Sequence, residues 1–286
     1  MEGPKVSIVM PAYNEAQNIG RVLEELAGLG LPDVEIIVVD DGSYDGTSEV
    51  ARAHGARVIR HPYNRGNGAA VRTGIRAAVG EVVVLMDSDG QHNPADIPRL
   101  LEKMDSYDMV VGARPPRAGV WYRNLANWIY NRFASYIAGF PVRDLTSGFR
   151  AIRAPLAKSM CYLLPNTFSA STTITLAVAR GGYGIAYVPI QIRRRAGGKS
   201  KISLLRDGFR FFVLMAKVAT LFSPLKVFGP LSILVGGPGF VYAIYRLAIG
   251  KAWTIPITIS LTMGALILLL GLISEQIATL RFQHME

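Results

Sequence analysis

EVVVLMDSDGQHNP, residues 81–94, is the stretch that decides the fold. Its apolar run, Val82–Met86, ends abruptly in Asp87, Ser88 and Asp89, a pattern typical of a buried parallel strand that carries carboxylates at its C-terminal end. Two carboxylates held this close repel each other in a poorly hydrated site, so either a proton is partly retained or a cation lies between them. The stretch therefore predicts a charged site at the end of a buried strand.

Oxygen donors dominate this candidate site. Gln91 adds an amide to Asp87 and Asp89, and hard oxygen ligands suit Mg²⁺ or Mn²⁺ rather than zinc. Ligands of open α/β sheets bind beside the carboxyl ends of the strands, which predicts a metal-bound phosphate group here. The alternative is an ordinary turn of Asp and Gly without a ligand, and the neighbouring motifs must decide between the two.

Composition and charge narrow the class of protein. The 286 residues allow one or two domains, and 50% of them are hydrophobic, which is ample for a core. The net charge of +10 is uneven, because residues 193–217 hold eight Lys or Arg against one acid, Asp207. Such a cluster indicates nucleic acid, an anionic membrane surface or a phosphorylated substrate. The single cysteine, Cys161, excludes an internal disulfide and fits a reducing compartment.

The first 111 residues alternate short apolar runs with helical stretches, and no signal peptide is expected because the first apolar run is too short. This βαβ series predicts a mostly parallel, doubly wound sheet. The expected strands are Val6–Met10, Val34–Val39, Arg57–Arg60, Val82–Met86 and Asp108–Val111. The expected helices are Ala16–Leu29, Thr47–His54, Gly68–Val79 and Ala95–Met104.

Polar residues follow three of these strands, so acidic groups should meet at one edge of the sheet. Asp40 or Asp41 could accept hydrogen bonds from a base or ribose, and Tyr13 could stack on a ring. Neither the Gly-x-Gly-x-x-Gly fingerprint of dinucleotide sites nor a P-loop is present. A nucleoside diphosphate held through a metal is the better prediction.

Four motifs carry a family resemblance: PAYNE at 11–15, DDGS at 40–43, NRGNGAAVRTG at 64–74 and DSDGQHNP at 87–94. In this order they resemble the nucleotide-sugar half of glycosyltransferase family 2. The whole chain resembles the polyprenyl-phosphate glycosyltransferases typified by dolichol-phosphate mannose synthase. The resemblance implies a GT-A type fold, a doubly wound, mostly parallel, Rossmann-like sheet.

The resemblance also implies roles for single residues. Asp40 would lie near the base, although it could equally be a turn residue, and Glu15 a helix-start residue. The implied nucleotide-sugar set is Pro11, Ala12, Tyr13, Glu15, Asp40, Asp41, Asn67, Gly68, Asp87, Ser88, Asp89 and Gln91. The implied metal ligands are Asp87, Asp89 and Gln91.

The acceptor half carries two further family-like motifs. DLTSGFR at 144–150 resembles the loop that approaches the lipid phosphate, with Ser147 donating a hydrogen bond and Arg150 structural; the alternative is a tight turn before a strand. Residues 195–201 match Arg-x-x-Gly-x-Ser-Lys, whose cations suit phosphate, although a solvated basic loop fits as well. The resulting catalytic set is Asp89, Arg114, Arg123, Asp144, Ser147, Arg195 and Lys201, with Asp144 a base or an organiser of the acceptor loop.

Two segments leave alternatives open. Apolar residues recur at helical spacing from Trp121 to Ile137, and this helix could pack on the core or lie at a membrane interface. Residues 166–173, NTFSASTT, could begin a helix or form an acceptor loop.

The C-terminal third predicts attachment to a lipid bilayer. Residues 202–226 form a basic amphipathic pattern suited to the headgroup layer, and two apolar spans follow at about 227–250 and 254–277. Gly236–Gly239 predicts a kink or a close helix contact. The basic excess before the first span predicts a cytoplasmic catalytic domain. The expected domains are 1–201 (nucleotide-sugar half 1–113, acceptor half 114–201), the interface helix 202–226 and the hairpin 227–286.

The resemblance implies an inverting, metal-dependent hexosyltransferase, with mannose or glucose favoured. The donor would be a GDP- or UDP-sugar and the acceptor a polyprenyl or dolichyl phosphate; nucleic acid is not an expected partner, and a homo-oligomer is left open. One alternative is a processive polysaccharide synthase, although its Gln-x-x-Arg-Trp motif and additional spans are missing. The other is a non-catalytic membrane protein that binds nucleotide sugars or anionic lipid.

Overall fold

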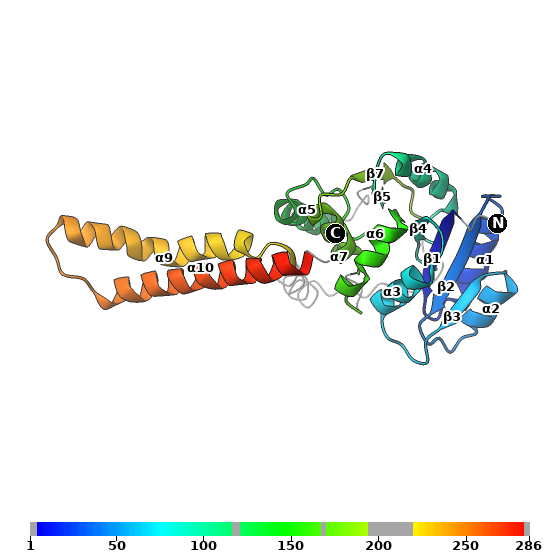
Figure 1. Ribbon diagram of the computed structural model, residues 1–286, viewed down its shortest axis with the longest axis horizontal. Helices are drawn as coiled ribbons and strands as arrows, with labels where there is room; N and C mark the ends of the chain where they lie inside the picture. Colours follow the sequence, from blue (N-terminus) through cyan, green and yellow to red (C-terminus); the bar gives the residue numbers. More distant parts are fainter. Residues whose placement is uncertain (1–4, 116–120, 167–169, 194–219, 283–286) are drawn as a thin grey trace. The chain divides into compact units, whose positions relative to one another are not determined.

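The computed structural model describes residues 5–115, 121–166, 170–193 and 220–282 (Figure 1). The chain divides after Ile202 into two compact units, each described here by itself. The proposed interface helix 202–226 lies mainly outside the described residues, which resume at Thr220.

A seven-stranded sheet forms the first unit, in the order β3-β2-β1-β4-β6-β5-β7. All neighbouring pairs are parallel except those of β6, which runs antiparallel between β4 and β5. The strand order reverses beside β1, so β1 and β4 flank the switch point where ligands of open sheets bind. The strands are β1 Val6–Ala12, β2 Val34–Asp40, β3 Arg57–Arg60, β4 Val82–Leu85, β5 Met109–Ala113, β6 Arg150–Arg153 and β7 Ile185–Pro189.

The predicted mostly parallel, doubly wound sheet is confirmed, and all five expected strands are present. The antiparallel insertion of β6 and the addition of β7 complete the sheet beyond the switch point. The helices of this unit are α1 Ala16–Ala27, α2 Thr47–Ala53, α3 Asn67–Ala77, α4 Ile97–Leu101, α5 Trp121–Ala138, α6 Ala154–Ser159 and α7 Ala170–Arg180. The expected helix Ala95–Met104 is shorter, because 3₁₀ turns flank α4 on both sides.

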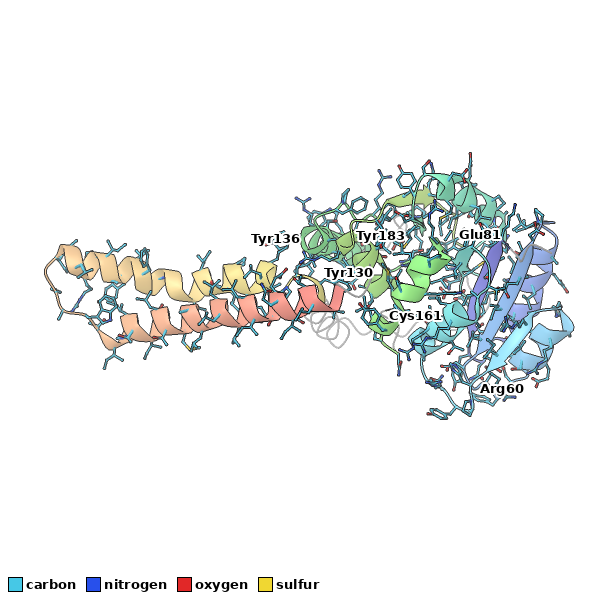
Figure 2. All side chains as sticks on the ribbon, viewed as in Figure 1. Arg60, Glu81, Tyr130, Tyr136, Cys161 and Tyr183 are labelled. Carbon is cyan, nitrogen blue, oxygen red and sulfur yellow. The ribbon has the colours of Figure 1, made fainter. Side chains whose placement is uncertain are left out.

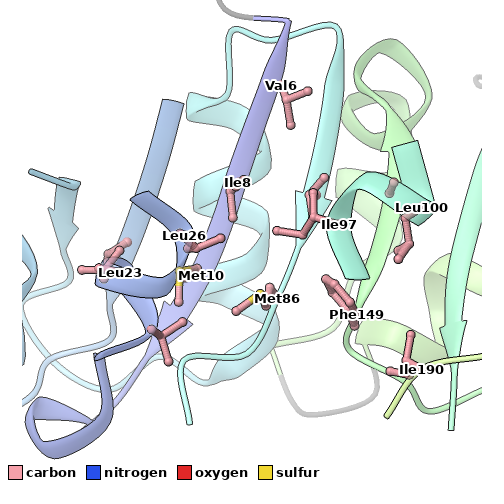
Figure 3. Packing of buried hydrophobic residues seen from close by; sticks show 14 of the residues in the cluster. Val6, Ile8, Met10, Leu23, Leu26, Met86, Ile97, Leu100, Phe149 and Ile190 are labelled. Atoms are coloured by element: carbon pink, nitrogen blue, oxygen red, sulfur yellow. The ribbon is translucent and has the colours of Figure 1, made fainter. Parts of the chain in front are cut away.

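The core explains why β1 is apolar except for the buried Ser7. Ile8 and Met10 point to one face, where side chains of α1 and α4 such as Leu23 and Ile97 cover them (Figure 3). The opposite face meets α3, where a Cβ on Gly74 would lie 2.2 Å from the Val9 side chain. A strand covered on both faces has no polar side and shows no alternation.

Helix α5 is amphipathic, as its spacing predicts. Tyr130 is buried, and its hydroxyl lies 3.1 Å from Thr172 Oγ1 on α7, whereas Tyr136 of the same helix is exposed (Figure 2). Burial raises the pKa of Tyr130. Trp128 is 62% exposed. One face of α5 therefore packs on the unit, and a second face presents aromatic side chains outward.

The second unit is a helical hairpin of α9 Leu225–Ala248 and α10 Ile255–Phe282. Both helices are long and apolar enough to cross a membrane, and little of either is buried within the hairpin. A Cβ on Gly264 would lie 2.7 Å from the Gly236 Cα, so the absence of side chains brings the two backbones together. The two predicted apolar helices and their close contact are confirmed.

Candidate active site

A cleft of about 530 Å³ opens at the carboxyl ends of β1, β2 and β4. Nine of the predicted nucleotide-sugar residues line it, namely Pro11, Ala12, Tyr13, Glu15, Asp41, Asn67, Asp87, Ser88 and Asp89. Sequence reasoning missed other residues of the lining, among them Thr146, Gly148 and Ser171. The lining does not include Asp40, Gly68 or Gln91 within the described residues.

Asp87 and Asp89 project from the loop after β4, with Ser88 between them. The Ser88 hydroxyl is buried and donates to the Pro11 carbonyl at 2.9 Å, which ties this loop to the end of β1. Asp89 accepts the backbone N–H of Gln91 at 3.0 Å. The Asp87 side chain is 44% exposed, and no hydrogen-bond donor is recorded for it within the described residues. The acid pair is therefore only partly satisfied by the protein.

The donor set of this loop fits a divalent cation that shares a phosphate ligand. The described residues contain no group of three or more His, Cys, Asp or Glu side chains that could hold a metal. Two carboxylates are nevertheless a usual protein contribution to Mg²⁺ sites, where waters and substrate phosphates complete the coordination. Gln91 contributes through its backbone here, since its N–H orients Asp89 and its carbonyl accepts the Arg193 N–H at 2.9 Å.

Asp40, the last residue of β2, and the adjacent Asp41 have different surroundings. Asp40 is buried and accepts the Ser43 N–H at 2.8 Å and the Ser48 hydroxyl, so it holds its own turn. Asp41 lines the cleft and accepts the N–H groups of Arg65 and Gly66 at 2.9 and 2.8 Å. Asp41 therefore fixes the loop that leads into α3 and forms one wall of the cleft.

Two further residues of the first strand motif complete this wall. Tyr13 is half exposed, and its ring lies edge-on to Tyr44 with centroids 6.3 Å apart, which leaves a ring face available for stacking. Glu15 is largely buried and accepts the Asn18 side-chain amide at 2.7 Å.

Asp144 is surrounded by donors. The Arg114 side chain binds it in a bidentate manner, with Nε to Oδ2 and Nη2 to Oδ1 both at 2.8 Å. The backbone N–H groups of Arg114, Thr146 and Ser147 add three bonds of 3.0–3.2 Å. Burial alone would raise the pKa of Asp144, but the hydrogen bonds and charge of Arg114 lower it below its ordinary value. An ionised, fully engaged carboxylate suits an organiser of the loop better than a base.

Ser147 and Arg150, two further polar residues of the acceptor loop, also donate their hydrogen bonds to the protein. Ser147 is fully buried, and its hydroxyl donates to the Gly112 carbonyl at 2.6 Å. Arg150 is buried and donates to the carbonyls of Ser147 and Ser171 and to Thr175, so it joins the loop to α7. Burial lowers the pKa of Arg150 to about 10. The structural role expected for Arg150 agrees with these contacts.

His92 is a buried residue beside the acid pair that sequence reasoning did not single out. Its ring stacks on Phe149 with centroids 5.2 Å apart, and its Nδ1 lies 3.9 Å from Asp87 Oδ2. Burial lowers the pKa of His92, although the charges of Asp87 and Asp89 oppose this. The one sequence signal for His92 is its position within the motif DSDGQHNP, three residues after Asp89.

The side chains of three predicted cations, Arg123, Arg195 and Lys201, lie outside what the structure describes. The backbone of Arg123 lies in α5, whereas Arg195 and Lys201 fall outside the described residues.

Residues 166–173 were expected to begin a helix or to form an acceptor loop. The Asn166 carbonyl accepts the Gly68 N–H at 3.1 Å, and α7 begins four residues later at Ala170. The stretch 166–173 therefore contains a helix start.

A mostly parallel sheet with a partly satisfied acid pair at its switch point, facing a nucleotide-sized cleft, defines the GT-A class of glycosyltransferase folds. The chain belongs to glycosyl transferase family 2, whose family model matches residues 7–160. A second model, the GtrB C-terminal hairpin, matches residues 223–280 and indicates a membrane protein.

Individual relatives agree with this assignment. The chain is 29% identical to an undecaprenyl-phosphate 4-deoxy-4-formamido-L-arabinose transferase of Aeromonas hydrophila over 95% of its own length and 88% of that protein. It is 29% identical to the glycosyltransferase AglJ of Haloferax volcanii, covering 98% and 96% of the two chains. Among solved structures, the glucosyl-3-phosphoglycerate synthase of Mycobacterium tuberculosis, in complex with Mn²⁺, UDP and glucosyl-3-phosphoglycerate, matches with a TM-score of 0.60 and 25% identity. That match covers 76% of this chain and 80% of the synthase.

Proposed function

We propose that this protein is an inverting glycosyltransferase that moves a hexose, mannose or glucose favoured, from a GDP- or UDP-sugar to a polyprenyl or dolichyl phosphate. The observation that carries the proposal is the partly satisfied pair Asp87 and Asp89 in a nucleotide-sized cleft of a chain that also has an apolar hairpin. A polyprenyl chain stays in the bilayer, so an enzyme acting on its phosphate must work at the membrane surface.

The donor half would bind the nucleotide through groups that line the cleft. Tyr13 would stack on the base, and Asp41 would accept a hydrogen bond from the nucleoside. Asp87 and Asp89 would hold Mg²⁺ or Mn²⁺, with Gln91 orienting Asp89. The bound ion would supply positive charge beside the leaving diphosphate.

The acceptor phosphate would attack the anomeric carbon, and the nucleoside diphosphate would leave with inversion. A phosphate monoester has a second pKa of about 6 and is largely dianionic near neutral pH, so no general base is required. This agrees with Asp144, whose lone pairs the protein already occupies. Asp144 and Arg114 would then shape the acceptor loop, and Arg123, Arg195 and Lys201 are proposed to offset phosphate repulsion.

The comparisons support the lipid acceptor more than a soluble one. Both relatives named above that span nearly the whole chain are transferases, and the name of one specifies undecaprenyl phosphate. The glucosyl-3-phosphoglycerate synthase has a small phosphorylated product, but its match leaves about a quarter of this chain uncovered. We further propose the division into residues 1–201, 202–226 and 227–286, with the catalytic domain in the cytoplasm.

The deciding experiment replaces Asp89. Asp89→Ala should lower sugar transfer by about 100-fold or more, because it removes charge that stabilises the leaving diphosphate. The measurement is the transfer of radiolabelled sugar from GDP-mannose, GDP-glucose or UDP-glucose into a lipid-extractable product by the purified protein with polyprenyl phosphate.

The matched control is Asp105→Ala, which removes an exposed acid distant in sequence from every cleft motif. It should retain wild-type transfer. Turnover by Asp89→Ala at the wild-type rate would overturn the proposed role of the acid pair. Failure of the wild-type protein to label lipid with any donor would favour a non-catalytic binding protein.

A further inference from the structure

His61 is a buried residue of the donor half that the proposed chemistry does not use. It follows β3 directly and is 4% exposed. Its Nδ1 lies 2.7 Å from Asp41 Oδ1, and its Nε2 lies 3.0 Å from Thr73 Oγ1 on α3. Its backbone N–H donates to the Asp40 carbonyl at 2.8 Å. His61 thus connects the end of β2 with the helix that borders the cleft.

The partners of His61 define the proton positions on its ring. An ionised carboxylate can only accept hydrogen bonds, so Nδ1 must carry the proton that is donated to Asp41. In the neutral ring Nε2 then accepts from the Thr73 hydroxyl. The imidazole is therefore oriented from both sides and cannot turn without losing two buried hydrogen bonds.

This orientation sets how Asp41 faces the cleft. Within the described residues Asp41 accepts from three donors, which are His61 Nδ1 and the N–H groups of Arg65 and Gly66. A carboxylate has about four acceptor positions, so one position of the cleft-lining Asp41 remains for a ligand.

The same contacts hold the neighbouring wall. Gly66 has a φ of +97° and caps the start of α3, and both Gly66 and Asn67 line the cleft. Asp41 binds the Gly66 N–H, so a displaced Asp41 would also release this turn.

We propose that His61 is a positioning residue of the nucleoside pocket, which holds Asp41 so that its last acceptor position meets an N–H or hydroxyl group of the donor nucleoside. This inference rests on the proposed function, since it assumes a nucleotide in the cleft. His61 itself is not among the residues that line the cleft, so it would act through Asp41.

Two substitutions separate the contacts of the ring. The amide nitrogen of Asn reaches the position of Nδ1, so His61→Asn keeps the donor to Asp41. The longer Gln reaches the position of Nε2, so His61→Gln keeps only the contact with Thr73. Both remove the ring, which makes them matched controls for lost packing.

The test measures binding of UDP and GDP, each with Mn²⁺, to the purified full-length chain by calorimetry. His61→Gln should weaken binding of the preferred nucleotide about tenfold, the cost of one hydrogen bond to a charged group. His61→Asn should stay within about threefold of wild type, because a neutral amide still donates to Asp41. The KM for polyprenyl phosphate should be unchanged in both variants.

Equal losses in the Asn and Gln variants, together with equal falls in apparent Tm, would overturn the proposal in favour of a purely structural role. Thr73→Val provides a second test, because it removes only the Nε2 contact and should weaken nucleotide binding less than His61→Gln does. A larger loss of nucleotide affinity in Thr73→Val than in His61→Gln would contradict the proposal that the contact with Asp41 matters most. If the wild-type protein binds neither UDP nor GDP, the proposed function itself fails, and that outcome is distinct from a failure of His61 alone.

Discussion

Asp144 and the pair Asp87 and Asp89 are carboxylates of one site with opposite surroundings. Asp144 receives five hydrogen bonds of 2.8–3.2 Å, two of them from the Arg114 side chain. Asp89 receives one such bond, from Gln91, and Asp87 has none within the described residues. A charge that the protein compensates fully holds structure, whereas a charge left uncompensated is available to a ligand. The difference therefore separates the part of the site whose charge the protein compensates from the part that we propose binds a metal ion.

Removal of divalent metal should have the largest effect on sugar transfer. It should act through Asp87 and Asp89, because Asp144 is already compensated by Arg114. Chelation by EDTA is expected to reduce sugar transfer about 100-fold or more, because the charge opposite the leaving diphosphate is lost. Mn²⁺ or Mg²⁺ should restore transfer, as measured by label in the lipid fraction. Full activity in EDTA would mean that protein side chains, and not a metal ion, compensate the charge of the diphosphate. It would contradict the distinction drawn between Asp144 and the pair Asp87 and Asp89.

Asp144→Asn should have an intermediate effect, on stability. Five donors would lose their ionised acceptor, and the apparent free energy of unfolding should fall by about 2 kcal/mol, less than for a fully buried ion pair because Arg114 is partly exposed. The measurement is the apparent Tm in detergent, with Asp89→Asn as the matched variant that should leave Tm unchanged. Equal effects of the two substitutions would contradict the distinction.

The pH dependence of this difference has a definite sign. The pKa of Asp144 is lowered from 3.8 by its partners, so its stabilising contribution is complete above that value and is lost as the pH falls through the lower folded pKa. The Tm difference between wild type and Asp144→Asn should therefore be constant from neutral pH to about pH 5 and should shrink in more acidic solution. If this difference in Tm disappeared near neutral pH, a group other than Asp144 would be responsible for it.

Ser88→Ala should have the smallest effect and sharpens the comparison within the acid loop. The substitution leaves the buried Pro11 carbonyl without this donor and should cost about 1 kcal/mol. The KM for the nucleotide sugar should rise by a small factor, because Asp87 and Asp89 lose the tie that holds their loop to β1. Ser106→Ala, which changes an exposed serine outside this loop, is the control and should leave both Tm and KM unchanged. An unchanged Tm would show that Ser88 does not fix the loop.

Much of the donor half could be predicted from the sequence, because each strand end combines an apolar run with a motif in the order of the fold. The distinction between Asp40 and Asp41 could not be predicted. The two acids are adjacent, and only the geometry of the turn shows that one faces its own loop and the other the cleft. The role proposed for His61 also depends on contacts with residues 12 and 20 positions away in the chain.

The acceptor half was harder to predict for physical reasons. A strand that includes Ile152 can be expected from its apolar residues, but periodicity does not encode direction, and β6 runs antiparallel. Ser147 has a hydroxyl that could serve a ligand or the fold, and the structure uses it for the Gly112 carbonyl. The structural role of Arg150 was expected from the motif, but its complete burial and its partners on α7 are visible only in the structure.

Gly148 limits how the two halves of the site can diverge during evolution. A Cβ at this position would lie 2.6 Å from Asp87 Oδ2, so any larger residue would displace the carboxylate. Thr146, two residues earlier, is exposed, and its restriction is of another kind, because its hydroxyl accepts from Arg114 and donates to Asp144. Ser147 and Phe149 on either side of Gly148 are fully buried, so a side chain at residue 148 requires a compensating change at the acid that faces it.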